Sequence, residues 1–258
     1  MRDHTTSGRH DRAFGSAAIV AVILLCLSAS AGGLDPVPQA ATDGAVSSTP
    51  TPSVLATGRQ YVGGDEFNGT GVDQSRWGVY NSVGSGGYGL RRPRQISQSG
   101  GALTISCTAA GTTGGMMYSS PQKYGLWEAR VRVSPASSNI HPVLLLWPAD
   151  GDWPVGGEID YLEVTDPSRQ SAEGFLHYGE DDSQTNDSIP VDLTRYNVFS
   201  VKWTDTGVYY YLNNLMWFSD TDPAHVPNRP MQPTIQLDYT GGIATPGTMT
   251  VDWIRIYN

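Results

Sequence analysis

The chain has 258 residues, thirty of them glycine and seventeen proline, and a formal net charge of −9 at pH 7. This acidity argues against nucleic acid and anionic membrane surfaces as partners, and it is compatible with a neutral substrate.

The first 31 residues are typical of a secretory signal. Three arginines, Arg2, Arg9 and Arg12, precede the apolar run "AAIVAVILLCL", and the small residues "SASA" follow it, which predicts cleavage after Ala31. A retained membrane anchor is the alternative, although the run is shorter than the ~20 residues of a spanning helix. Cys26 is expected to be removed with this segment. The mature protein is therefore predicted to be secreted, in the extracellular space or associated with the cell wall, without stable membrane insertion.

Residues 32–58 predict a linker, because they are rich in proline, alanine, serine and threonine and have no aromatic residue to bury. Residues 59–258 then form a single domain, a length that is ordinary for an all-β protein. Its one cysteine, Cys107 in "ALTISCTA", excludes an intrachain disulfide. We interpret Cys107 as a small buried residue, the alternative being a reactive thiol.

The domain shows many short alternating runs and no long stretch with helical periodicity, which predicts an all-β fold. In "LWEARVRV", residues Trp127, Ala129, Val131 and Val133 share one face, and the charged residues between them share the other. Turn signals flank "VYYYL", so residues 201–218 are expected to form a three-stranded meander. We predict a two-sheet antiparallel β-sandwich of the jelly-roll type, concanavalin A-like, with a concave face that could hold a polymer.

The stretch "GGEIDYLEV" places Glu158, Asp160 and Glu163 close together. On a regular strand Glu163 would face away from the other two, but one extra residue near Tyr161 or Leu162, in a β-bulge, would bring all three to one face. Paired carboxyl groups of this kind hydrolyse glycosidic bonds with retention. The alternative is a solvated acidic strand face.

This stretch, together with its flanks, resembles glycoside hydrolase family 16, the laminarinase and lichenase family, in its bulged E-x-D-x-x-E form. "GGDEFNGTGVDQSRW", "GGALTIS", "YGLWEARVRV", "GFLHYG" and "MTVDWIRIYN" resemble further segments of the family in the same order. The resemblance implies that Glu158 is the nucleophile, that Asp160 assists it, and that Glu163 is the acid and then the base. It also implies that His177 borders these carboxylates, unless His177 is only a half-buried strand residue.

Substrate contacts are expected from aromatic side chains, which stack on sugar rings. Trp147 and Trp153 are the candidates, with core packing as the alternative. Where many relatives have a tryptophan this chain has Leu145, and Trp147, two residues on, could replace it. Arg91 is a further candidate for sugar contacts, although a solvated loop charge is the usual role of such a residue.

The family resemblance also implies a structural calcium ion, for which Glu66 and Asp252 would be ligands. No cofactor is required for the chemistry. The expected partner of the protein, which we expect to be a monomer, is a polysaccharide. The predicted function is a secreted retaining endo-β-glycan hydrolase, an endo-β-1,3- or β-1,3-1,4-glucanase. The alternatives are a non-catalytic carbohydrate-binding protein on the same fold, a transglycosylase, or a hydrolase of another β-glycan such as galactan.

Overall fold

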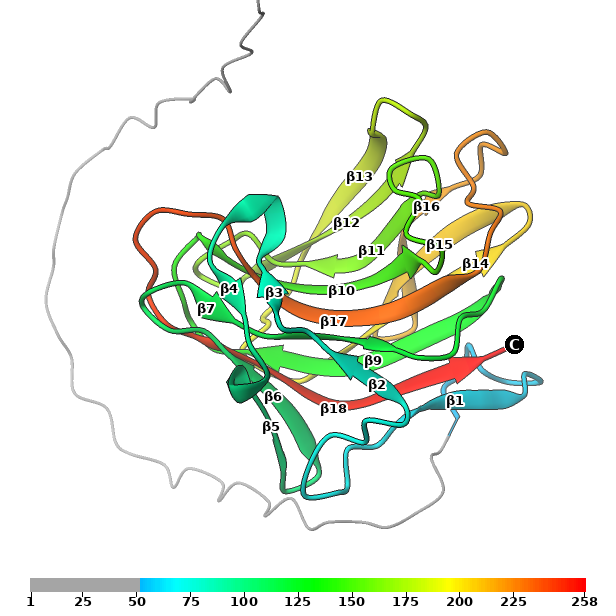
Figure 1. Ribbon diagram of the computed structural model, residues 1–258. Helices are drawn as coiled ribbons and strands as arrows, with labels where there is room; N and C mark the ends of the chain where they lie inside the picture. The colour runs from blue at the N-terminus through cyan, green and yellow to red at the C-terminus, as the bar shows by residue number, and fades with distance from the viewer. Residues whose placement is uncertain (1–51) are drawn as a thin grey trace, which may run out of the picture. The chain divides into compact units, whose positions relative to one another are not determined.

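The computed structural model describes residues 52–258, which belong to one compact unit (Figure 1). The predicted signal segment, Cys26 and most of the predicted linker lie outside the described residues. Apart from two single-turn 3-10 helices, Ser85–Gly87 and Pro93–Gln95, the regular elements of this part of the chain are β-strands. Among residues 52–258, no helix is long and apolar enough to span a membrane.

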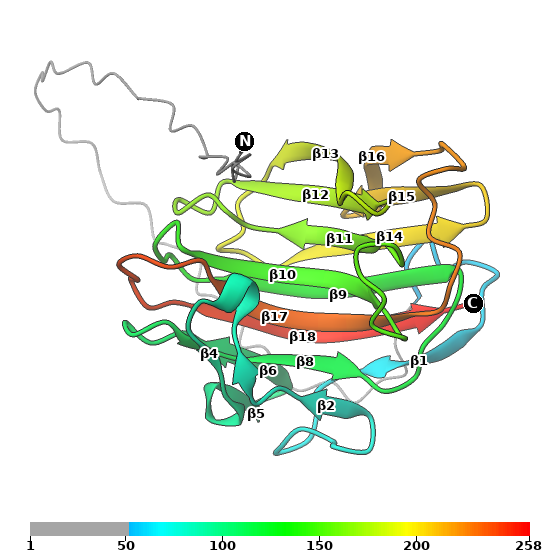
Figure 2. The same ribbon diagram turned by 45° about the horizontal axis from the view of Figure 1, so that its top comes forward.

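Most strands belong to two large antiparallel sheets (Figures 1 and 2). The first sheet has the order β16 (Leu215–Asp220), β15 (Gly207–Leu212), β14 (Asn197–Thr204), β9 (Gly125–Val133), β18 (Thr248–Tyr257), β6 (Ala102–Ser106) and β5 (Ile96–Ser99), and β1 (Tyr61–Asp65) also pairs with β18. The second has the order β13 (Ser183–Pro190), β12 (Ser171–Tyr178), β11 (Glu158–Glu163), β10 (Ile140–Pro148), β17 (Met231–Tyr239), β8 (Gly115–Tyr118) and β2 (Trp77–Val79).

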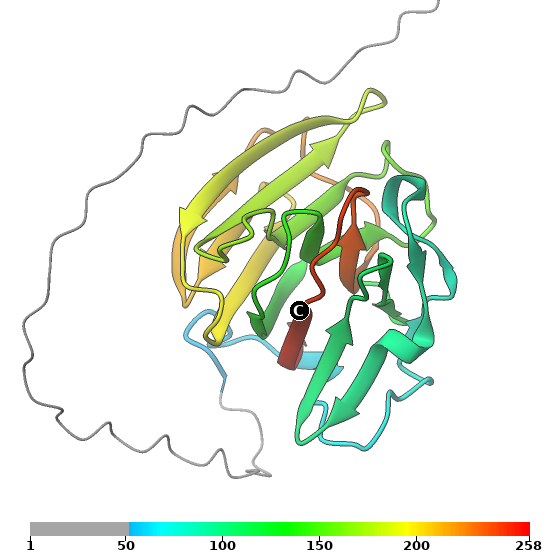
Figure 3. The same ribbon diagram turned by 90° about the vertical axis from the view of Figure 1, so that its left-hand side faces the viewer.

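A third, small sheet joins β3 (Ser82–Val83), β4 (Leu90–Arg91) and β7 (Thr112–Thr113), with β4 and β7 parallel. In Figure 3 the strands coloured yellow to orange, β13 to β16, lie on the side of the unit opposite the teal hairpin of β5 and β6. The all-β jelly-roll sandwich predicted from the alternating runs is thus confirmed, and so is the meander, which consists of β14, β15 and β16.

The hydrophobic core lies between the two large sheets. The predicted inner face of β9, from Trp127 to Val133, is buried there, and alternate residues of β10, β11 and β17 belong to the same cluster. Burial of each large apolar side chain contributes about 1.5–3 kcal/mol, so this layer is the main source of stability. Because side chains alternate along a strand, the remaining positions of β10, β11 and β17 are presented on the outer face of the second sheet.

The outer face of β9 differs from the expectation at Glu128, which is fully buried rather than solvated. Turns formed by the residues before β1 cover it: Ser53 donates a hydrogen bond of 2.5 Å to its carboxylate, and Ala56 packs against Leu126 and Tyr257. Burial raises the pKa of Glu128, while the hydroxyl groups of Ser53 and Ser200 act in the opposite direction. The end of the predicted linker therefore packs onto the domain.

Candidate active site

The bulge predicted in β11 is present, and Tyr161 is its extra residue. In the pairing of β10 with β11, Leu144 lies opposite Leu162, but Leu145 lies opposite Asp160, so Tyr161 has no partner of its own. The apolar residues of β11 face the core on both sides of this irregularity. As a result Glu158, Asp160 and Glu163 all line one cavity on the outer face of the second sheet.

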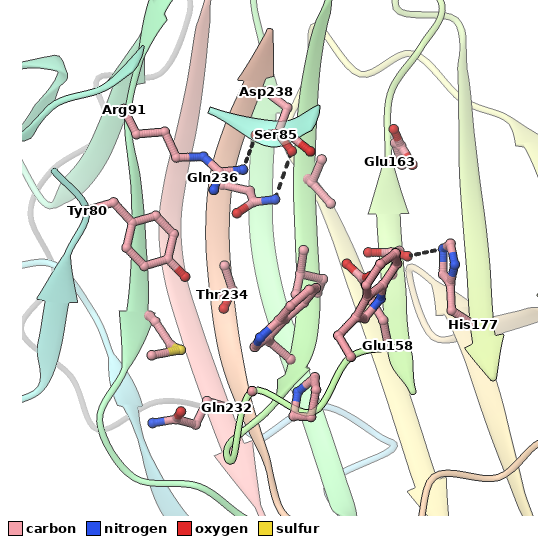
Figure 4. A pocket seen from close by; sticks show the side chains of 18 of the residues that line it. Tyr80, Ser85, Arg91, Glu158, Glu163, His177, Gln232, Thr234, Gln236 and Asp238 are labelled. Carbon is pink, nitrogen blue, oxygen red and sulfur yellow. Dashed lines mark hydrogen bonds and ion pairs between the residues drawn. The ribbon is translucent and has the colours of Figure 1, made fainter. Parts of the chain in front are cut away.

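This cavity has a volume of about 750 Å³ (Figure 4). Its floor follows from alternation along two neighbouring strands. β10 supplies the apolar side chains of Val143, Leu145 and Trp147. β17 supplies the polar side chains of Gln232, Thr234, Gln236 and Asp238. The loops around β3 and β4 and the loop before β11 supply the walls, with Tyr80, Ser85, Arg91 and Trp153.

Glu158 and Asp160 form a pair of interacting carboxyl groups in the cavity lining. Burial, together with the charge of Asp160, raises the pKa of Glu158 to about 10. Burial also raises the pKa of Asp160, to about 6, although its bond to His177 acts in the opposite direction. The charge of Asp160 disfavours ionisation of Glu158, so Glu158, whose pKa is raised the more, keeps its proton. The pair therefore retains one proton at neutral pH.

His177 joins this pair from β12, directly opposite Glu158 in the register. Its Nε2 lies 3.3 Å from Asp160 Oδ2 and its Nδ1 lies 2.8 Å from Asp182 Oδ1. Burial acts in the opposite direction, but these two carboxylates raise the pKa of His177 to about 9. The ring is therefore cationic at neutral pH and compensates part of the negative charge of the carboxylates. His177 thus borders the carboxylates, as the family resemblance implied.

Glu163 has its own histidine partner, His141 of β10. The distance from His141 Nδ1 to Glu163 Oε1 is 2.8 Å, and Nε2 lies 2.8 Å from the Ser138 carbonyl oxygen. His141 and Asp182 were not among the residues predicted from the sequence. The sequence pattern could have indicated His141, because in "IHPVLLLW" it lies on the same strand face as Val143 and Leu145. Asp182 lies in a loop whose course the sequence does not reveal.

The two candidate tryptophans lie together in the cavity lining. Their rings stack with centroids 5.9 Å apart and an angle of 14° between the planes, and Trp153 is 40% exposed. The Trp153 side chain also acts to lower the pKa of Glu158, in favour of its carboxylate. Leu145 is buried on the cavity floor, two residues before Trp147. Both tryptophans therefore line the cavity rather than the core.

Arg91 also lines the cavity but is not a solvated charge. Its guanidinium group contacts Asp238 at 2.5 Å, and the side chain is only 14% exposed. Gln236 donates a second hydrogen bond to Asp238, at 2.8 Å. The charge of the Arg91 guanidinium group is thus neutralised by a carboxylate.

Glu66 and Asp252 do not form a donor set that fits calcium. Arg255 binds Glu66 through two nitrogens, at 2.8 and 2.9 Å, and Arg130 binds Asp252 at 2.6 Å. Calcium requires six to eight oxygen ligands, and each of these carboxylates already holds a guanidinium group. Within residues 52–258, neither belongs to a group of three side chains that could hold a metal ion. The expectation of a calcium site on these two residues finds no support in this arrangement.

A sequence model of the glycosyl hydrolases family 16 matches residues 90–255. The glucan endo-1,3-beta-glucosidase A1 of Niallia circulans is 27% identical over 269 residues, which cover 81% of this chain and 39% of that protein. The keratan-sulfate endo-1,4-beta-galactosidase of Sphingobacterium multivorum is 24% identical over 275 residues, which cover 91% of this chain and 64% of that protein. The match therefore spans less than two thirds of either relative.

Among solved structures, the catalytic domain of an endo-1,3-beta-glucanase (laminarinase) from Thermotoga petrophila has a similar fold. It aligns with a TM-score of 0.71 at 19% identity, over 78% of this chain and 98% of that one. At this identity the likeness concerns the fold alone.

Proposed function

The chain belongs to glycosyl hydrolase family 16, and we propose that it is a secreted, retaining, endo-acting β-glycan hydrolase with β-1,3- or mixed β-1,3-1,4-glucan as its substrate. The observation that carries the proposal is the convergence of Glu158, Asp160 and Glu163 on one open cavity through the bulge at Tyr161. A strand face that was merely solvated would not need the bulge. A non-catalytic binding protein would not need the coupled, proton-sharing carboxyl groups.

In the proposed first step, Glu158 attacks the anomeric carbon while Glu163 gives its proton to the leaving oxygen. A covalent glycosyl-enzyme forms as the old glycosidic bond breaks, and its electron pair stays with the leaving oxygen. In the second step Glu163, now a base, takes a proton from water, and the water oxygen displaces Glu158. The product then keeps the anomeric configuration of the substrate.

Glu158 must be ionised in order to attack, so in the reactive state the proton that its raised pKa places on Glu158 in the free site has to lie on Asp160 instead. One neighbour favours the carboxylate of Glu158. The Trp153 side chain acts to lower the pKa of Glu158, against burial and the charge of Asp160. His177 offsets the charge that remains.

The cavity lining favours an uncharged glycan. Its polar floor on β17 is composed largely of the neutral side chains Gln232, Thr234 and Gln236, which suit sugar hydroxyl groups. Arg91 is already bound by Asp238, so it offers no free positive charge for a sulfate or carboxylate substituent. The stacked pair of Trp147 and Trp153 supplies an apolar surface for sugar rings.

The test is the release of reducing ends from laminarin, mixed-linkage β-glucan, β-1,3-galactan, agarose and xyloglucan, by the wild type and by Glu158→Gln and Glu163→Gln. We expect release from laminarin or mixed-linkage glucan, as internal fragments of many lengths, and its loss in both variants. Release from galactan alone would correct the substrate, and longer products formed with an added acceptor would indicate transglycosylation. Retention of polymer without cleavage would overturn the hydrolase assignment.

Azide distinguishes the two glutamates. In Glu163→Ala, azide should attack the glycosyl-enzyme and give the β-glycosyl azide, whereas in Glu158→Ala it should enter from the opposite face and give the α-product. An exchange of these outcomes between the variants would reverse the proposed roles.

A further inference from the structure

The hydrogen bonds of His141 define its protonation state. Nε2 lies 2.8 Å from a backbone carbonyl oxygen, that of Ser138, which can only accept, so Nε2 carries a hydrogen. Nδ1 lies 2.8 Å from Glu163 Oε1. When Glu163 is ionised this oxygen also can only accept, so Nδ1 must carry a hydrogen as well, and a ring with both hydrogens is an imidazolium.

The charges around His141 support this form. Burial acts in the opposite direction, but Glu163 on β11 and Asp238 on β17 raise the pKa of His141. Asp238 lies opposite His141 in the register, although Arg91 of β4 already pairs with Asp238 and weakens its effect. Glu173 of β12 is paired with Glu163 in the register and adds a further negative charge on that side.

We propose that His141 is a positioning residue that, as an imidazolium, holds Oε1 of Glu163 and stabilises the carboxylate formed when Glu163 gives its proton to the leaving oxygen. This inference rests on the proposed function, because it assigns an auxiliary role to a neighbour of the acid and base.

Before the first step both His141 Nδ1 and the second carboxyl oxygen of Glu163 carry a proton. The carboxyl proton then moves to the leaving oxygen, and an imidazolium–carboxylate ion pair remains. In the second step Glu163 takes a proton from the attacking water, and the doubly protonated pair is restored. The ion pair exists only after proton transfer has begun, so His141 acts on the transition state more than on the bound substrate.

The first test of His141 as a cation does not depend on enzymatic activity. Side-chain NMR of ring-labelled protein should show His141 doubly protonated throughout the pH range of activity, and its titration should move to lower pH in Glu163→Gln. A neutral His141 in that range, or an unchanged titration in Glu163→Gln, would overturn the proposal. The NMR titration can be interpreted even if no polymer is cleaved. A wrong assignment for His141 can therefore be distinguished from a wrong assignment of the hydrolase function.

The kinetic test compares His141→Gln with wild type on the polymer and on a nitrophenyl glycoside of its disaccharide unit. The sugar leaving group of the polymer needs a proton, whereas nitrophenolate leaves without one. We expect kcat/KM to fall ~10-fold on the polymer and less than ~2-fold on the aryl glycoside. The basic limb of the pH–rate profile should move to higher pH, because the cation that favours loss of the acid's proton is gone.

The matched control is His225→Gln, since His225 also binds an aspartate, Asp220 at 2.9 Å, but does not line the cavity. His225→Gln should leave kcat/KM on both substrates, and the pH–rate profile, unchanged. An equal loss on both substrates in His141→Gln, with an unmoved basic limb, would mean that His141 only supports the local structure and would refute the assignment.

Discussion

Asp182 helps to keep His177, which lies opposite the proposed nucleophile Glu158, positively charged, and its replacement by asparagine tests the electrostatics of the site. The carboxylate lies 2.8 Å from His177 Nδ1, while Asp160 contacts Nε2 at 3.3 Å. Asparagine keeps the size and can still accept a hydrogen bond, but it removes the charge. We therefore expect the pKa of His177 to fall from about 9 without a change of fold.

The magnitude follows from Coulomb's law. Two unit charges ~4 Å apart interact by ~4 kcal/mol at the effective dielectric constant of a protein surface. The side chain of Asp182 is 38% exposed, so solvent screens the pair. We discount the interaction to about 1 kcal/mol, or somewhat less than one pKa unit.

The shift also has a consequence for stability. A histidine whose pKa is raised in the folded state stabilises the protein below its unfolded value and loses this contribution as the pH rises through the folded value. The free energy of unfolding of Asp182→Asn should therefore lie about 1 kcal/mol below that of wild type near neutral pH and should approach it above about pH 9.

The assay is NMR titration of the histidine rings combined with urea unfolding at several pH values. Asp181→Asn is the matched control, because Asp181 is adjacent and acidic but contacts Ser183 instead, at 2.9 Å. An unchanged His177 titration in Asp182→Asn, or an equal shift in both variants, would refute the reasoning.

Three further predictions concern the rest of the domain. Glu128→Gln should gain stability relative to wild type as the pH rises through the raised pKa of Glu128, because burial disfavours the carboxylate; urea unfolding at pH 5 and pH 8 measures the difference, and a constant difference would contradict it. Ser53→Ala should lower the free energy of unfolding by about 1 kcal/mol through loss of its bond to Glu128, whereas Val54→Ala, at a largely exposed position, should not. Cys107, buried and with its pKa raised to about 11 by that burial, should react with a thiol reagent only after unfolding, in a Cys26→Ser background; fast native labelling would show that it is accessible.

Much of the fold could be predicted because alternation along a strand is a local property. The buried face of β9 and the turns of the meander were readable from single segments of sequence. The bulge at Tyr161 was also readable, because three carboxylates out of phase cannot share a face without an extra residue.

What the sequence could not indicate were contacts between distant segments. Glu128 alternates with apolar residues and was therefore expected to be solvated, but the turn containing Ser53 covers it from 75 positions away. Arg91 gave no sign of its partner Asp238, because the pairing depends on how the small sheet lies beside β17. Which residues cover a strand or neutralise a charge is a property of the assembled layers.

The bulge does more for the site than align three carboxylates. Three acidic groups in one cavity oppose each other's ionisation, and the site compensates with two histidines, one on each flanking strand. His177 lies opposite Glu158 on β12, while the shifted register sets Glu163 opposite Val143, so that His141, two residues away on the same face of β10, can reach it. Without Tyr161, Glu163 would face the core, where neither His141 nor a substrate could meet it. One extra residue thus determines which carboxylates share the cavity and also brings Glu163, the proposed acid and base, within reach of His141.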